Sequence, residues 1–181
     1  GRVIEAGNLA GWVDFSLRAC LQEHFPVAIG IEQDANAAAL GEQWRGAARG
    51  EREFVFLALG TGIGAGIVIN GHLHRGAHHA AGEVGNLVMS REFLGEDRGG
   101  QGNLASLIGG RTLRAQAEAA TGEEISAAEA ITASSKNSEL AQVAEEVIDY
   151  VAMTVIAISS LLDPPLIILG GGTAEAGYDL T

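Results

Sequence analysis

The stretch EFVFLALGTGIGAGIVING (53–71) constrains the fold more than any other part of the chain. Residues 53–60 form an almost continuous apolar run, which is typical of a strand that is buried on both faces. The glycines of residues 60–66 predict a turn, and residues 67–71 predict a second strand. The Asn-Gly pair that ends this strand is a strong hairpin signal, so we expect residues 72–76 to return as a third strand.

Helices are predicted on both sides of this sheet segment. Their signal is apolar residues at helical spacing or an alanine-rich composition, and they cover residues 16–25, 36–48, 107–122, 125–132 and 139–163. The second half of the last helix is apolar all round, so we expect it to be buried. Short strands are expected at residues 27–31 and 166–172, the latter ending in a glycine loop. Strands that alternate with helices predict an α/β fold.

Charge and composition exclude several classes of protein. The chain has 11 Lys and Arg against 23 Asp and Glu, a net charge of −12, so we expect no contact of this segment with nucleic acid or an anionic membrane. A single cysteine, Cys20, excludes a disulfide framework. Residues 1–9 lack the features of a signal peptide, and the longest apolar run, residues 151–162, is too short to cross a bilayer. We therefore expect a cytoplasmic protein.

Two junctions between a strand and a glycine run, FLALGTGIGAG and LIILGGG, are candidate phosphate-binding sites. Glycine has no Cβ, so backbone N–H groups at such a turn can surround a phosphate. The candidate residues share this setting and are Gly60, Thr61, Gly62, Gly64, Gly170, Gly171 and Gly172. The first junction contains a G-x-G-x-x-G-like pattern, but a predicted strand follows it instead of a helix, which argues against a dinucleotide-binding fingerprint.

Asp34 lies between a predicted strand and a predicted helix. A carboxylate at such a junction can take a proton from a substrate hydroxyl as a general base. It can equally cap the helix N-terminus, which is a common role of aspartate. Asn36 has the same two interpretations, and the residues alone leave both open.

Four histidines lie close together in the sequence, at His72, His74, His78 and His79. They could indicate a metal site, but apart from Glu83 no acid or cysteine accompanies them at a recognisable ligand spacing. Histidines at the surface or behind a binding site explain the pattern better. We expect no metal ion to be held here.

In combination, four segments resemble the ROK family of sugar kinases and sugar-responsive transcriptional repressors. They follow in the family's order, and are NLAGW (8–12), EQDANAAALGE (32–42), LGTGIGAGIVINGHLHRGAHHAAGEVGN (59–86) and DPPLIILGGG (163–172). The resemblance implies an actin-like ATPase (ribonuclease H-like) fold, in which two α/β lobes hold nucleotide and sugar between them. Residues 1–35 would end the N-terminal lobe, and residues 36–181 would form a C-terminal lobe that stops soon after LGGG. The family's first phosphate loop would precede Gly1, so we expect the chain to be a fragment.

The resemblance also assigns roles to residues. Asp34 would deprotonate the sugar hydroxyl that attacks the γ-phosphoryl group of ATP, which would bind with Mg²⁺. Asp34 would also bind the sugar, together with Gln33, Glu83 and Asn86, which fall at positions that bind sugar in the family. The loop Gly60, Thr61, Gly62 and Gly64 would hold phosphates, and Gly170, Gly171 and Gly172 would lie near the adenosine. The expected partners are a hexose or hexose derivative and a second copy of the chain, because family members commonly form dimers.

The chain departs from the family pattern at the sugar and zinc positions. Gln33 replaces an asparagine, and Asn86 replaces a histidine that serves both sugar and zinc. Aligned without gaps, the family's three zinc-binding cysteines and a sugar-binding glutamate correspond to Glu96, Arg98, Asn103 and Ala105. Zn²⁺ needs thiolates or imidazoles in a tetrahedral array, so we expect no structural zinc.

These departures leave the function open between three classes. The first is an ATP-dependent hexose kinase, favoured by Asp34, Glu83 and the two glycine loops. The second is a sugar-responsive repressor without kinase activity, whose helix-turn-helix would lie N-terminal to this segment. The third is a sugar-binding protein with neither activity.

Overall fold

The computed structural model describes residues 1–3, 11–96 and 103–176 of the chain. Its sheet has four strands in the order β3-β2-β1-β4. In chain order the strands are β1 (Phe54–Leu59), β2 (Ile63–Ile69), β3 (His72–Leu73) and β4 (Ile167–Gly170). β1 pairs antiparallel with β2 and parallel with β4, so the sheet is mixed.

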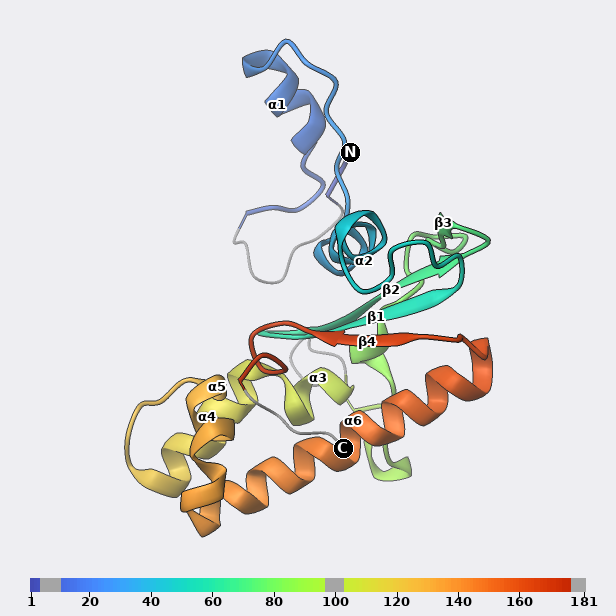
Figure 1. The fold of residues 1–181 in the computed structure, drawn as a ribbon. Helices are drawn as coiled ribbons and strands as arrows, with labels where there is room; N and C mark the ends of the chain where they lie inside the picture. The colour runs from blue at the N-terminus through green and yellow to red at the C-terminus, as the bar shows by residue number, and fades with distance from the viewer. Residues whose placement is uncertain (4–10, 97–102, 177–181) are drawn as a thin grey trace.

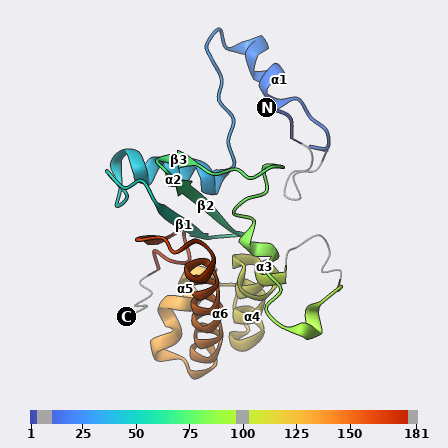
Figure 2. The same ribbon diagram turned by 90° about the vertical axis from the view of Figure 1, so that its right-hand side faces the viewer.

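Helices cover both faces of this sheet, as Figures 1 and 2 show. α2 lies on one face, α3 to α6 lie on the other, and α1 stands away from the sheet beyond α2. The bounds are α1 (Leu17–His24), α2 (Asp34–Arg45), α3 (Asn103–Ile108), α4 (Gly110–Thr121), α5 (Ala127–Ala133) and α6 (Ser138–Leu162). Short 3₁₀ turns occur at Val84–Asn86, Arg91–Phe93 and Ser134–Lys136. The α/β prediction is confirmed.

The central strand β1 is buried on both faces, as its unbroken apolar run predicts. On one face, Val55 and Leu57 belong to a buried cluster with Leu104 of α3. On the other face, Phe54 belongs to a second cluster with Ala39 of α2. Complete burial of such a side chain contributes about 1.5–3 kcal/mol, so β1 holds the two helical layers together.

The glycine-rich turn after β1 is shorter than expected. The sequence predicted a turn over residues 60–66, whereas β2 already begins at Ile63 and contains Gly64 and Gly66. A Cβ on Gly66 would lie 2.5 Å from the Cβ of Ala39, so glycine here permits α2 to pack closely on the sheet. The hairpin prediction is confirmed, because β2 pairs antiparallel with β3 and Asn70 and Gly71 have positive φ angles of 56° and 79°. The return strand is shorter than expected, since β3 spans His72–Leu73 and not residues 72–76.

Two other predictions, a strand and a single helix, differ from the structure. Residues 27–31 form no strand, and Val27 is 64% exposed. The expected helix over residues 107–122 is two helices, α3 and α4, which meet at Gly109. A Cβ on Gly109 would lie 2.4 Å from the carbonyl oxygen of Ala105, and the residue has an extended backbone at the start of α4.

The apolar second half of α6 predicted burial on all sides, but the helix is buried on one side alone. Val151 and Ile158 face the core, whereas Ile156 is 65% and Leu161 80% exposed. Only one side of this helix meets the sheet and the neighbouring helices of the described residues. No helix in the described residues is long and apolar enough to cross a membrane.

Candidate functional site

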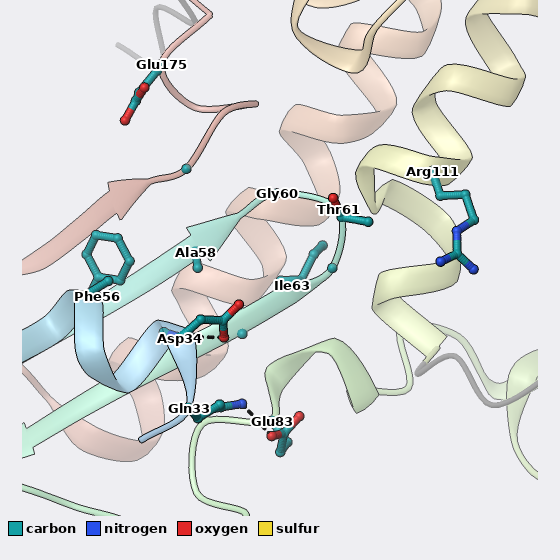
Figure 3. A pocket seen from close by; sticks show the side chains of 15 residues that line it. Gln33, Asp34, Phe56, Ala58, Gly60, Thr61, Ile63, Glu83, Arg111 and Glu175 are labelled. Atoms are coloured by element: carbon teal, nitrogen blue, oxygen red, sulfur yellow. Dashed lines mark hydrogen bonds between the residues drawn. The ribbon is translucent and has the colours of Figure 1, made fainter. Parts of the chain in front are cut away.

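Gln33 and Asp34 begin α2 at the edge of a cavity. Asp34 is the first residue of the helix, and Gln33, its N-cap residue, makes no side-chain capping hydrogen bond. The backbone N–H of Ala35 donates to Asp34 Oδ1 over 2.8 Å, which orients the carboxylate. Figure 3 shows both side chains at the cavity, with Thr61 and Glu83 coming from other segments.

This first cavity has a volume of about 1090 Å³ and brings together most of the predicted site residues. The predicted residues that line it are Gln33, Asp34, Gly60, Thr61, Gly62, Gly64, Glu83 and Gly171. They come from the start of α2, the β1–β2 turn, the loop after β3 and the end of β4. Four separate segments therefore converge on one space.

Glu83 is placed in the first cavity by the glycine before it. Gly82 has a φ of 89°, and its carbonyl oxygen accepts the N–H of Ala65 in β2 over 2.7 Å. A Cβ on Gly82 would lie only 1.9 Å from the carbonyl oxygen of Ala65, so only glycine fits here. Gln33 Nε2 then donates to Glu83 Oε1 over 2.6 Å, which joins the two sides of the cavity.

A second link, an ion pair, joins the same two segments. Arg75 Nε and Nη2 donate to Glu32 Oε2 over 2.8 and 2.5 Å. Glu32 Oε1 accepts from the N–H of Gln33 and from Asn36 Nδ2. Burial raises the pKa of Glu32, but these hydrogen bonds and the charge of Arg75 outweigh it, so the net pKa of Glu32 is lowered. The start of α2 is thus bound to the loop that carries Glu83.

A second cavity of about 440 Å³ lies beside the first. Gly60, Thr61 and Arg111 line both cavities. The other residues of the second cavity belong mainly to α4, α5 and the loop after β4, and are Gly110, Arg114, Ser126, Ala127, Ala128, Gly172 and Thr173. The glycine turn after β1 thus forms a wall between two spaces.

Two predicted site residues line neither of these cavities. Asn86 is an exposed residue at the end of the 3₁₀ turn Val84–Asn86. Gly170 ends β4, where a Cβ would lie 2.6 Å from the ring of Phe56, so its role is close packing against β1. Gly171 and Gly172 are divided between the first and the second cavity.

Arg111 and Glu175 line the first cavity and were not expected from the sequence. Arg111 stands in the first turn of α4, directly after Gly109 and Gly110. Glu175 lies three residues beyond Gly172. The available signal was a charged residue that follows a glycine pair directly or a glycine loop within a few residues, but neither residue belongs to a motif.

The positions that correspond to the family's zinc ligands carry no thiolate or imidazole. Glu96 is exposed, and Asn103 is a buried amide whose Oδ1 accepts the N–H of Met89 over 3.0 Å. Arg98 lies outside the described residues, and Asn86, at the position of the family's zinc-binding histidine, is an exposed amide. Within the described ranges, no three residues of the His, Cys, Asp and Glu types are grouped to hold a metal ion, and this includes the four histidines. The donor set does not fit zinc.

Known proteins resemble the chain over nearly its whole length. The model of the ROK family matches residues 1–180. A glucokinase of Halalkalibacterium halodurans is 29% identical, and the match covers 99% of this chain and 59% of the glucokinase. A xylose repressor of Bacillus spizizenii is 40% identical over 80 residues, which is 44% of this chain and 21% of the repressor.

A solved structure gives the same result for the fold. The ROK family glucokinase from Streptomyces griseus, in complex with glucose and AMPPNP, superposes with a TM-score of 0.84 at 27% identity, and the match covers 97% of this chain and 62% of that one. The predicted actin-like ATPase fold is thus confirmed, and the chain spans about three fifths of the length of the glucokinases it matches. The sequence motifs, the fold and the match over residues 1–180 agree, and the chain belongs to the ROK family.

Proposed function

We propose that the protein is an ATP-dependent sugar kinase, which transfers the γ-phosphoryl group of ATP to a hydroxyl of a hexose or hexose derivative. The observation that carries this proposal is the convergence of Asp34, Glu83 and the turn Gly60–Gly62 on one cavity. Phosphoryl transfer depends mainly on positioning and on charge stabilisation, and these residues are suited to both. The glucokinase relatives support the same reaction.

The proposed roles follow from the chemistry of each side chain. Asp34 takes the proton of the attacking hydroxyl as general base. Glu83 accepts hydrogen bonds from other hydroxyls of the sugar. Because Gln33 already donates to Glu83 Oε1, a sugar hydroxyl would donate to Oε2. Gln33 also presents its own amide oxygen as an acceptor.

The phosphates of ATP are assigned to the wall between the two cavities. The Gly60 N–H donates to the carbonyl oxygen of Gly62 and closes the turn, so the backbone N–H groups of Thr61 and Gly62 are the proposed donors there, and Gly172 of the second cavity would lie toward the adenosine. Asp34 and Glu175 are carboxylates of the first cavity and have the oxygen donors that Mg²⁺ prefers. Bound together with ATP, Mg²⁺ would neutralise part of the negative charge of the triphosphate.

A coupled assay of ATP consumption by the intact protein, across hexoses and their derivatives, tests the proposal. We expect turnover with at least one sugar, and a decrease of kcat by about 100-fold or more in Asp34→Asn, because a positioned general base contributes that much. Binding of the sugar, measured by calorimetry, should be nearly unchanged in this variant. Absence of turnover with every sugar would refute the kinase function.

A sugar-responsive transcriptional regulator is the second candidate. The xylose repressor is 40% identical over 80 residues, a higher identity than that of the glucokinase, although the repressor matches only 44% of the chain. Gln33 and Asn86 in place of the family's sugar-binding residues are also compatible with loss of catalysis. A protein that binds a sugar without consuming ATP, and whose affinity for DNA changes with that sugar, would be this regulator.

A further inference from the structure

The charges of the two cavities are unevenly distributed. The first cavity is lined by three carboxylates, Asp34, Glu83 and Glu175, and by one cation, Arg111. The second cavity is lined by Arg111 and Arg114, and its described lining contains no carboxylate. A neutral polyol can occupy the acidic space, whereas a polyanion is repelled from it and attracted toward the two arginines.

Arg111 stands where the two cavities meet. It lies in the first turn of α4, and the N–H of the preceding Gly110 donates to the carbonyl oxygen of Gly60 over 2.8 Å. The start of α4 is therefore fixed directly to the glycine turn that we assign to the phosphates. Figure 3 shows the Arg111 side chain extending from α4 on the Thr61 side of the cavity.

We propose that Arg111 is a phosphate-binding residue, whose guanidinium donates to oxygens of the ATP triphosphate; this inference rests on the proposed kinase function. Guanidinium presents a planar fork of N–H donors that matches two phosphate oxygens at once. As the sugar oxygen bonds to Pγ and the bond from Pγ to the β–γ bridging oxygen breaks, negative charge moves onto ADP. The hydroxyl proton goes to Asp34, and Arg111 stabilises the negative charge on the phosphates of the departing ADP.

Arg114, one turn further along α4, provides a matched control. It also lines the second cavity, and its Nη2 lies 3.8 Å from Glu124 Oε1 in an exposed ion pair. It lines the second cavity alone, whereas Arg111 lines both. Loss of Arg114 should therefore weaken phosphate binding much less than loss of Arg111.

The test measures binding of ATP and of inorganic tripolyphosphate to the intact protein by calorimetry. We expect Arg111→Gln to weaken both ligands by about tenfold or more, Arg111→Lys to recover part of the loss, and Arg114→Gln to change either by less than about threefold. Thermal unfolding shows whether each variant is folded, and unchanged sugar binding shows that the first cavity is intact.

The outcomes separate this inference from the kinase proposal. The role of Arg111 is overturned if Arg111→Gln binds tripolyphosphate as tightly as the wild type, whatever the protein catalyses. It is also overturned if the wild type binds neither ATP nor tripolyphosphate. Weaker binding in Arg111→Gln, together with no turnover of any sugar by the wild type, supports the phosphate site and refutes the kinase. Turnover at saturating ATP should also fall in Arg111→Gln.

Discussion

The ion pair between Glu32 and Arg75 should couple the start of α2 to the loop that carries Glu83. We consider a double-mutant cycle of Glu32→Gln and Arg75→Gln in the intact protein. Each single substitution removes the charge of one partner. Glu32→Gln retains the approximate size of the side chain, and Arg75→Gln retains a polar end group. The cycle isolates the coupling between the two side chains, because contacts made separately by each residue cancel.

The expected coupling can be bounded from the exposure of the pair. Hydrogen bonds to charged groups contribute about 1.5–3 kcal/mol when buried, and exposed ion pairs about 0.2–1 kcal/mol. The side chains of Glu32 and Arg75 are 23% and 43% exposed, so solvent screens the pair partly. Two donors of Arg75 nevertheless contact one carboxylate oxygen. We expect a coupling free energy of about 1 kcal/mol, between these limits.

Urea unfolding at neutral and acidic pH provides the measurement. The folded-state pKa of Glu32 is lowered, so the pair's stabilisation is complete above the unfolded-state pKa, about 4.3 for glutamate, and is lost as pH falls through the folded-state pKa. The coupling should therefore be present at pH 7 and decrease below about pH 4. Additive effects of the two substitutions at pH 7 would refute the reasoning, as would a coupling that is independent of pH.

Three further predictions concern glycine, asparagine and metal. Gly82→Ala should destabilise the protein by about 2 kcal/mol or more in thermal unfolding, because the added Cβ would meet the carbonyl oxygen of Ala65. Gly50→Ala is the control, since Gly50 has a similar φ of 91° and an added Cβ would have nothing within 4 Å. Equal effects of the two substitutions would contradict the role of the close approach. Asn103→Ala should cost about 1–3 kcal/mol, because the partly buried N–H of Met89 loses its acceptor. A loss near zero in urea unfolding would show that water replaces the amide. A strong zinc chelator should leave the melting temperature unchanged, and a decrease on chelation would show a metal that the described residues do not account for.

Local patterns predicted the centre of the sheet well. The apolar run before Gly60 predicted a strand buried on both faces, and β1 has side chains in both core clusters. The Asn70-Gly71 pair predicted the hairpin, because its two positive φ angles are a local property of the backbone. These signals depend on neighbouring residues in the sequence, so they survive without knowledge of the tertiary structure.

Predictions that depended on distant partners were less accurate. Residues 27–31 were apolar enough for a strand, but a strand also needs an edge with which to pair. The second half of α6 was apolar on every side, yet Ile156 and Leu161 find no covering element among the described residues. Arg111 was missed for the same reason, because its place between two cavities is created by the contact of Gly110 with Gly60 and leaves no motif in the sequence.

The shared wall formed by Gly60 and Thr61 has a thermodynamic consequence. A ligand on either side would contact the same short stretch of backbone, which offers a route for coupling the two binding equilibria. Any factor by which one ligand changes the affinity for the other must act equally in the reverse direction, because the coupling free energy is a property of the doubly occupied protein. Cooperativity between the occupants of the two cavities would then arise from two residues of the turn, without a motion of the whole molecule.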